Sequence, residues 1–272
     1  MHHTESWRLL PLHIGSSSWH FALSDALARH VQSPTLWWHA TREPTLILGP
    51  GQSRVLVDVG ACERAGVLVI QRQAGGTAVY AADGVLGLDV ALPDGHPLAT
   101  ADVVEAYRWL GEVWVEAVSG LGVEAELVTV DQARRAAQQT RPFEDLIRLA
   151  CFGSLSPYEV TVGGKKLVGL AQVRRRRNVL LQSGIHLRFD AGALAGLLAP
   201  ARAAELTAAL ESAGVGLEAA APAEQPHKIT DVIAAFGRSM RARMGIELAL
   251  GAWADDELAH ARRVELETLD SR

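Results

Sequence analysis

The chain has 272 residues, of which 49% are hydrophobic and 21% charged, and its formal net charge is -5 at pH 7. This composition suits a globular protein with a sizeable core, and the slight acidity argues against a nucleic-acid binder. No apolar run approaches the roughly 18 residues that span a membrane, and the N-terminus lacks a secretory signal, so we expect a cytoplasmic protein without a membrane partner. Two cysteines make no disulfide framework, and no Cys or His spacing resembles a metal site.

Apolar periodicity predicts a mixed α/β fold of the α+β class, with no linker that divides the chain. Strands are expected at residues 7–14, 36–39, 45–48, 67–70, 85–92, 124–130, 179–187 and 246–250. Helices are expected at 19–31, 57–65, 101–120, 230–244 and 255–269, with two more within 191–223. The polar segment 131–142 is expected to be an exposed loop.

A glycine pair follows the expected strand 67–70, in the run Gln-Arg-Gln-Ala-Gly-Gly-Thr-Ala-Val-Tyr from Gln71 to Tyr80. Glycines at such a point let backbone amides approach a ligand with no Cβ in the way, and Arg72 can hold an anion or a carbonyl. A tight turn with a surface arginine explains the same residues equally well, because short glycine motifs are frequent.

The stretch from Ala150 to Leu187 contains the strongest chemical signal. Cys151 lies in a run of small residues, and Lys166 follows a Gly-Gly turn that joins two strands. A thiolate is the reactive form of cysteine, and a lysine ammonium nearby favours it. This pair predicts acyl-transfer chemistry if the strands bring both side chains to one pocket. The alternative is that Cys151 is a small core residue, as we expect for Cys62, and that Lys166 is solvated.

Four consecutive arginines, residues 174–177, form the densest charge in the chain. They are either a solvated hairpin tip or a docking patch for an acidic partner, which would mainly raise the association rate. Nucleic acid is a poor third choice because this basic run is isolated in a net acidic protein.

Two motifs together resemble one superfamily, that of the lipoate–protein ligases, lipoyl/octanoyl transferases and biotin–protein ligases. Residues 71–79 resemble its arginine and glycine-pair motif, and Lys-Leu-Val-Gly-Leu-Ala-Gln at 166–172 resembles its lysine motif. Residues 44–49 and 22–27 fit its N-terminal pattern. The resemblance implies one catalytic domain over residues 1–272, with a large mixed sheet, a smaller sheet, flanking helices and no separate C-terminal accessory domain.

Within this superfamily, Ala150-Cys151-Phe152 followed by Tyr158-Glu159 is most similar to the cysteine-dependent octanoyltransferases. Their cysteine carries an acyl thioester, and a lysine fifteen positions later lowers its pKa; Cys151 and Lys166 have this separation. The resemblance implies that octanoyl, or lipoyl, moves from acyl carrier protein to Cys151 and then to a lysine of a lipoyl domain, without ATP or another cofactor. Glycine cleavage H protein and the 2-oxoacid dehydrogenase E2 subunit carry such domains. The implied acyl pocket comprises Arg72, Gly75, Gly76, Thr77, Ala78, Gly169, Ala171, Gln172 and Gly184.

Three positions depart from the family pattern: Gln71 replaces a frequent second arginine, and Ala81 and Ser183 replace frequent histidines. Three alternatives therefore stay open. An ATP-dependent lipoate–protein ligase would use Lys166 at the lipoyl-adenylate and leave Cys151 incidental. The other two are an amidotransferase that moves octanoyl or lipoyl between lipoyl domains, and an inactive binder.

Overall fold

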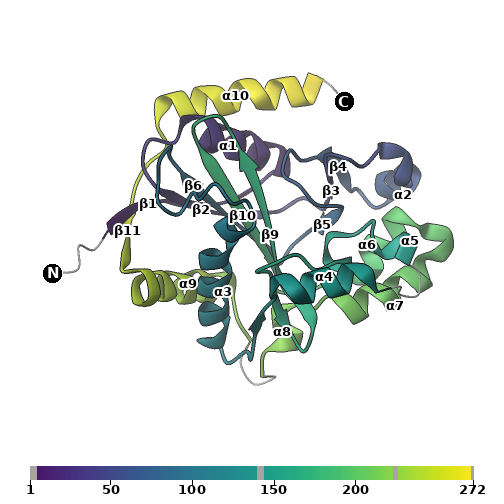
Figure 1. The fold of residues 1–272 in the computed structure, drawn as a ribbon. Coiled ribbons are helices and arrows are strands. Elements are labelled where there is room, and N and C mark those ends of the chain that lie inside the picture. The colour runs from purple at the N-terminus through teal and green to yellow at the C-terminus, as the bar shows by residue number, and fades with distance from the viewer. Residues whose placement is uncertain (1–4, 140–143, 223–225, 271–272) are drawn as a thin grey trace.

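The protein is described here by a computed structural model that covers residues 5–139, 144–222 and 226–270. Within these ranges, strands form one large and one small sheet (Figure 1). The large sheet comprises β1 (Glu5–Gly15), β2 (Thr35–Thr41), β6 (Val85–Leu92), β7 (Glu126–Leu127), β8 (Val160–Val162), β9 (Lys165–Arg174), β10 (Val179–His186) and β11 (Ile246–Leu250). The small sheet comprises β3 (Thr45–Leu48), β4 (Leu68–Gln71) and β5 (Val79–Ala81).

Both sheets are mixed. The large sheet has the order β11-β1-β2-β6-β10-β9-β8-β7, in which β1 runs parallel to β2 and β11 and the other pairs are antiparallel. The small sheet has the order β4-β3-β5, with β3 parallel to β4 and antiparallel to β5. The predicted fold class, a large mixed sheet with a smaller sheet and flanking helices, is confirmed.

Helices cover both faces of the large sheet. The α-helices are α1 (Ser17–His30), α2 (Val59–Arg64), α3 (Arg108–Ser119), α4 (Val130–Gln138), α5 (Glu144–Ile147), α6 (Ala191–Leu198), α7 (Ala203–Ala213), α8 (Leu217–Ala220), α9 (Ile229–Met244) and α10 (Asp255–Asp270). Short 3-10 helices are η1 (Arg54–Leu56), η2 (Glu105–Tyr107), η3 (Cys151–Gly153) and η4 (Pro200–Arg202). None of the described helices is long and apolar enough to cross a bilayer.

Three clusters of buried residues hold these layers together. Helices α3 and α9 pack on one face of the large sheet around Trp38, Trp114 and Phe236. Helices α1 and α10 pack together on the other face, over Trp37 (Figure 1). The third cluster lies between the small sheet and α6 and α7, and it contains Cys62 at 2% exposure. The core role expected for Cys62 is therefore consistent with its burial.

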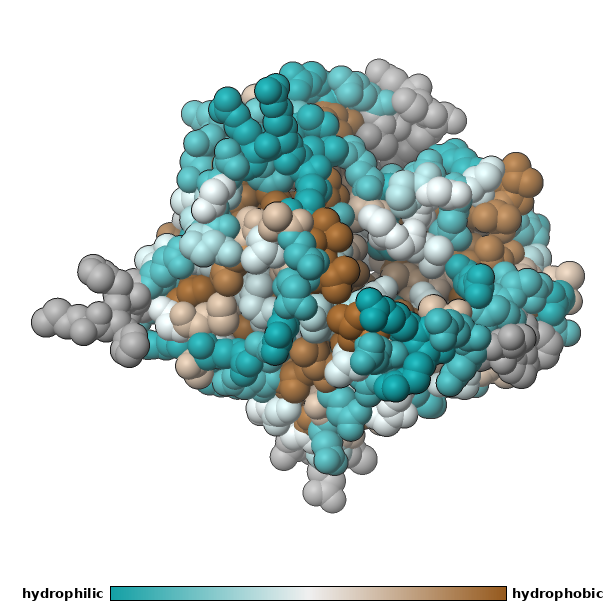
Figure 2. Space-filling view, in the orientation of Figure 1, coloured by the Kyte–Doolittle hydropathy of each residue, from teal (hydrophilic) through white to brown (hydrophobic). Residues whose placement is uncertain are grey.

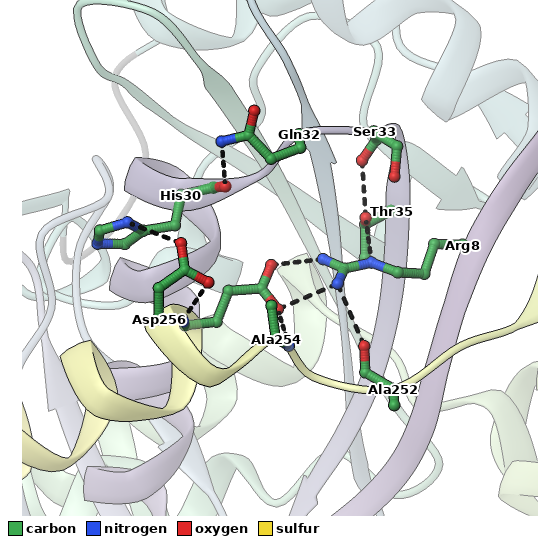
Figure 3. Close-up of polar contacts among 9 residues, drawn as sticks. Arg8, His30, Gln32, Ser33, Thr35, Ala252, Ala254 and Asp256 are labelled. Atoms are coloured by element: carbon green, nitrogen blue, oxygen red, sulfur yellow. Dashed lines mark hydrogen bonds and ion pairs between the residues drawn. The ribbon is translucent and has the colours of Figure 1, made fainter.

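Polar contacts anchor α10 to the sheet. Figure 3 shows Arg8 of β1 between Thr35 of β2 and Ala252, which precedes α10. The Arg8 guanidinium also donates from Nη1 to Glu257 Oε2 at 3.0 Å, and the Glu257 side chain is buried. These contacts fix the first turn of α10 against strands β1 and β2.

Local sequence signals explain the helix ends. The Ser16 side chain accepts from Trp19 N at the start of α1, and α9 ends at Gly245, whose φ is 64°. The expected loop at 131–142 is wrong over α4, which a capping box between Thr129 and Gln132 begins; residues 140–142 lie outside the described residues. Of the expected strand 124–130, only Glu126 and Leu127 form a strand, β7, and Val130 already belongs to α4.

Candidate active site

Backbone hydrogen bonds bring the glycine-pair segment and the cysteine segment together. The Cys151 N–H donates to the Ala78 carbonyl at 2.8 Å, and the Ala78 N–H donates to the Leu149 carbonyl at 3.0 Å. Gly76 has a φ of 100°, and a Cβ there would lie 2.4 Å from Arg72 Nη2 and 3.7 Å from Cys151 Sγ. Only glycine therefore lets the backbone approach both side chains at this point.

The turn at residues 49–52 packs against the backbone of the glycine pair. A Cβ on Gly49 would lie 1.8 Å from the Gly76 carbonyl oxygen, so the two backbones are in close contact. The Gln71 amide donates to the carbonyls of Gly49, Pro50 and Gln52 at 3.1, 3.2 and 3.0 Å. Gln71, which departs from the family pattern, thus holds this turn in place.

Lys166 is buried, with 1% exposure, and its ammonium has two partners. Nζ lies 2.7 Å from Glu159 Oε2 and donates to the Cys151 carbonyl oxygen at 2.8 Å. The alternative of a solvated lysine is wrong, because the side chain is buried and both of its polar partners belong to the protein. The structure places the ammonium on the cysteine's backbone and on a carboxylate, a partner that the spacing of Cys151 and Lys166 did not indicate.

Glu159 is the residue that reasoning from spacing missed. Its carboxylate also accepts the Ser156 N–H on Oε2 at 2.7 Å and the Leu170 N–H on Oε1 at 3.3 Å. The preceding Tyr158 adopts a φ of 65°, and its hydroxyl donates to Glu105. The only sequence signal for Glu159 was its place in the Tyr158-Glu159 pair. Both oxygens of the Glu159 carboxylate thus accept hydrogen bonds, and Oε2 also forms the ion pair that holds the buried Lys166 ammonium.

Two cavities meet at Cys151, which is half-buried. The first has a volume of about 140 Å³ and a largely apolar wall that includes Phe21, Ile47, Val79, Val85, Phe152 and Leu170. The second has a volume of about 320 Å³ and is lined by Lys166 and Glu159 among others. Figure 2 shows the surface hollowed between the β9–β10 hairpin and the small sheet, with hydrophobic residues along the edge.

The predicted pocket residues divide between these cavities. Those on the first are Arg72, Gly169, Ala171 and Gly184. Those on the second are Gly75, Gly76, Thr77 and Gln172, together with Ala171, which lines both cavities. Ala78 is fully buried and lines neither of the two, since its backbone is occupied in pairing with the cysteine segment.

The first cavity also contains polar side chains that the sequence did not single out. Asp89 of β6 is 1% exposed; its carboxylate accepts from Ser24 Oγ at 2.5 Å and from Gln182 Nε2 at 2.8 Å. His39 Nε2 lies 3.7 Å from Asp89 Oδ1. Burial, followed by the charges of two neighbouring histidines, lowers the pKa of His20 to about 2, so its imidazole is neutral. The sequence feature that could have indicated these polar side chains was Asp89, the only charged residue in the apolar strand 85–92.

The remaining predicted features lie outside this site. Within the described ranges, no group of three or more His, Cys, Asp or Glu could hold a metal ion. At the arginine run, Arg174 donates to the Thr100 carbonyl and Arg175 to Asp25, whereas Arg176 and Arg177 are exposed. Two arginines of the run therefore contact the rest of the protein, and the other two are exposed to solvent.

Curated relatives match this chain over most of their length. Octanoyltransferase LipM of Kyrpidia tusciae is 34% identical over 202 residues, which are 71% of this chain and 70% of that protein. Octanoyltransferase LipM of Brevibacillus brevis is 26% identical over 266 residues, covering 96% and 95% of the two chains.

Solved structures share the fold. A bi-partite lipoate protein ligase studied with its E2 lipoyl domain, from Thermoplasma acidophilum, superposes with a TM-score of 0.76 at 20% identity and covers 97% of this chain and 93% of that one. Lipoate-protein ligase A bound with ATP superposes with a TM-score of 0.76 at 19% identity, covering 96% and 95%. Residues 16–240, which include both the glycine pair and the lysine motif, match the lipoyl protein ligase A/B catalytic domain, and the chain belongs to that family.

Proposed function

We propose that this protein is an acyltransferase of protein lipoylation that moves octanoyl from acyl carrier protein to Cys151 and then to a lysine of a lipoyl domain. The observation that carries the proposal is the position of Cys151, whose side chain lines both an apolar cavity and the larger cavity beside it. An acyl chain fits the first cavity, and the carrier of the thioester or the acceptor amine reaches the sulfur through the second. The octanoyltransferase relatives support the same reaction.

Both steps are acyl transfers between nucleophiles. The Cys151 thiolate attacks the donor thioester carbonyl, a new carbon–sulfur bond forms, the carrier's carbon–sulfur bond breaks, and the carrier leaves as a thiolate that takes up a proton. The acceptor lysine amine then attacks the Cys151 thioester and an amide forms. The acyl–sulfur bond breaks, and the proton lost by the amine converts the released Cys151 thiolate to the thiol. The donor thioester supplies the driving force, so the reaction requires neither ATP nor another cofactor.

The surrounding residues assist by position and charge. The Lys166 ammonium, held by Glu159 and by the Cys151 carbonyl, places a positive charge beside the nucleophile's backbone. A Cβ on Gly76 would lie 3.7 Å from Cys151 Sγ, so the backbone of the glycine pair passes close to the place where negative charge develops on the carbonyl oxygen. Arg72, whose Nη2 donates to the Thr77 carbonyl at 3.0 Å, borders the acyl cavity.

Carrier protein and lipoyl domain are the proposed partners, the latter from glycine cleavage H protein or a 2-oxoacid dehydrogenase E2 subunit. The exposed Arg176 and Arg177 give an acidic carrier a basic contact at the β9–β10 tip, which would raise its association rate. The lipoyl domain associated with the Thermoplasma relative supports the choice of acceptor.

The covalent route is tested by intact mass spectrometry after incubation with octanoyl carrier protein. We expect one octanoyl adduct on the wild type and on Cys62→Ser, the matched control, and none on Cys151→Ser. Octanoyl transfer to an apo lipoyl domain should proceed without ATP. Full turnover with no adduct on the wild type would refute the covalent route, and transfer that needs ATP and free lipoate and survives Cys151→Ser would establish a ligase instead.

A further inference from the structure

Three glycines lie side by side across the strands beneath the first cavity. In the sheet register, Gly169 of β9 faces Gly184 of β10, and Gly184 faces Gly87 of β6. The next residue in this row is His39 of β2, which faces Gly87. All four line the first cavity. Gly87 was not among the predicted site residues, and only the strand register brings it into the row.

This glycine row makes a trough across the sheet, because residues facing each other in register point to the same face. A Cβ on Gly184 would meet no atom within 4 Å, so the space above the middle of the row is empty. At the β9 end, a Cβ on Gly169 would lie 3.7 Å from the Phe152 ring, next to Cys151. Cys151 lines the same cavity as Phe152 and Gly169, so the trough and the proposed nucleophile share one cavity.

The His39 imidazole closes the other end. Its ring stands directly over Gly87, where a Cβ would come within 2.3 Å of His39 Cε1. The ring is held between Trp37, with centroids 4.7 Å apart, and His20, with centroids 4.9 Å apart. His20 Nε2 is hydrogen-bonded to His13 Nδ1 at 2.9 Å. The His39 ring therefore cannot rotate away from Gly87 without disturbing the packed rings of Trp37, His20 and His13.

The length of the trough matches one class of acyl chain. Adjacent strands are about 4.8 Å apart, so Gly169 and Gly87 are separated by roughly 10 Å. Carbon–carbon bonds of about 1.52 Å at a near-tetrahedral angle advance an extended chain by roughly 1.25 Å each, or about 9 Å for eight carbons. Each further pair of carbons adds roughly 2.5 Å and meets the imidazole.

We propose that the glycine row and His39 form a ruler that limits the bound acyl chain to about eight carbons, with His39 as the specificity-determining residue. This inference rests on the proposed function for the identity of the site, since the first cavity is taken as the acyl cavity. Asp89 lies two residues after Gly87, and Gln182 lies two residues before Gly184, so this pair is the next one on the same face of the sheet. Their hydrogen-bonded side chains border the trough. His39, Asp89 and Gln182, which bound the trough, have no part in the proposed acyl transfer.

Binding of free fatty acids tests the ruler without any covalent step. Titration calorimetry of the full chain with octanoate, decanoate and dodecanoate should show that octanoate binds most tightly. His39→Ala opens the trough, so affinity should rise by about 4-fold for each methylene newly buried, or roughly 15-fold for decanoate relative to octanoate. Gly184→Ala places a methyl group in the empty trough without touching the protein, and octanoate affinity should fall about 10-fold or more.

The matched control is Gly196→Ala in α6, where a Cβ also meets no atom within 4 Å but lies away from the first cavity; its chain-length order should equal that of the wild type. No fatty-acid binding by the wild type, or an unchanged order in both His39→Ala and Gly184→Ala, would overturn the ruler. A normal order of fatty-acid binding with no octanoyl adduct on Cys151 would instead reject the proposed function and leave the ruler standing.

Discussion

The buried pair of Glu159 and Lys166 allows the most direct test of how the site is built. Both side chains are at most 2% exposed, and the Nζ–Oε2 distance is 2.7 Å. Glu159→Gln keeps the shape of the side chain and removes its charge. The Lys166 ammonium then stays buried with no counter-charge, and an amide NH₂ group competes for a position where Ser156 N and Lys166 Nζ both donate.

The expected cost follows from this burial. Removing one partner of a buried ion pair typically costs about 3–5 kcal/mol, because the remaining charge is left uncompensated. A loss of about 3 kcal/mol lowers the melting temperature of a chain of this size by roughly 6–12 °C. The matched control is Glu247→Gln, which removes the charge of an exposed pair with Arg241 and should cost about 1 kcal/mol or less.

A double variant separates stability from chemistry. Lys166→Met added to Glu159→Gln replaces the buried charge with an apolar chain of similar length, so we expect much of the lost stability to return. Acylation of Cys151 should nevertheless stay low in the double variant, because the ammonium is gone. Urea unfolding gives the free energies, and intact mass spectrometry gives the rate of adduct formation.

Two results would refute this reasoning. A Glu159→Gln variant that unfolds within about 0.5 kcal/mol of the wild type would mean that the pair is solvated rather than buried. A double variant that is stable and forms the adduct at the wild-type rate would mean that Lys166 has only a structural role.

Two further predictions concern the glycine pair and pH. Gly76→Ala should abolish the Cys151 adduct, measured by intact mass, because its Cβ would displace Arg72 and crowd the sulfur at a φ of 100°; wild-type acylation in this variant would contradict the proposed contact. Burial lowers the pKa of His186 to about 4, and burial with neighbouring charge lowers that of His20 to about 2. Below pH 6.5 the unfolded chain binds protons that the folded chain does not, so each histidine should lower the unfolding free energy by up to about 1.4 kcal/mol per pH unit, down to pH 4 for His186. Urea unfolding from pH 7.5 to 4.5 should show a shallower decline for His186→Leu than for the wild type, and equal slopes would count against this.

Several elements could be predicted from local pattern because their causes are local. The strand Val85–Leu92, the short strand Thr45–Leu48 and the end of α9 at Gly245 agree with the residues named from periodicity and turn signals. The loop expected at 131–142 failed for a local reason as well: the capping box at Thr129 outweighs the polar composition that suggested a loop.

The site depended partly on sequence and partly on tertiary structure. Motif resemblance indicated Cys151, Lys166 and the glycine pair, and the structure places them around adjoining cavities. Resemblance alone did not show that Lys166 pairs with Glu159, since the pairing depends on how the segment before β8 lies against β9.

By itself, the sequence determined which residue types were available: a cysteine among small residues, a lysine beyond a Gly-Gly turn, and the glycines that permit close backbone contact. Only the tertiary structure decided that Gly169, Gly184 and Gly87 form one row with a histidine at its end. The physical reason is that the row runs perpendicular to the chain, across four strands whose pairing is set by packing on both faces of the sheet. Neighbours in that direction are distant in sequence, and no local pattern encodes which of them meet.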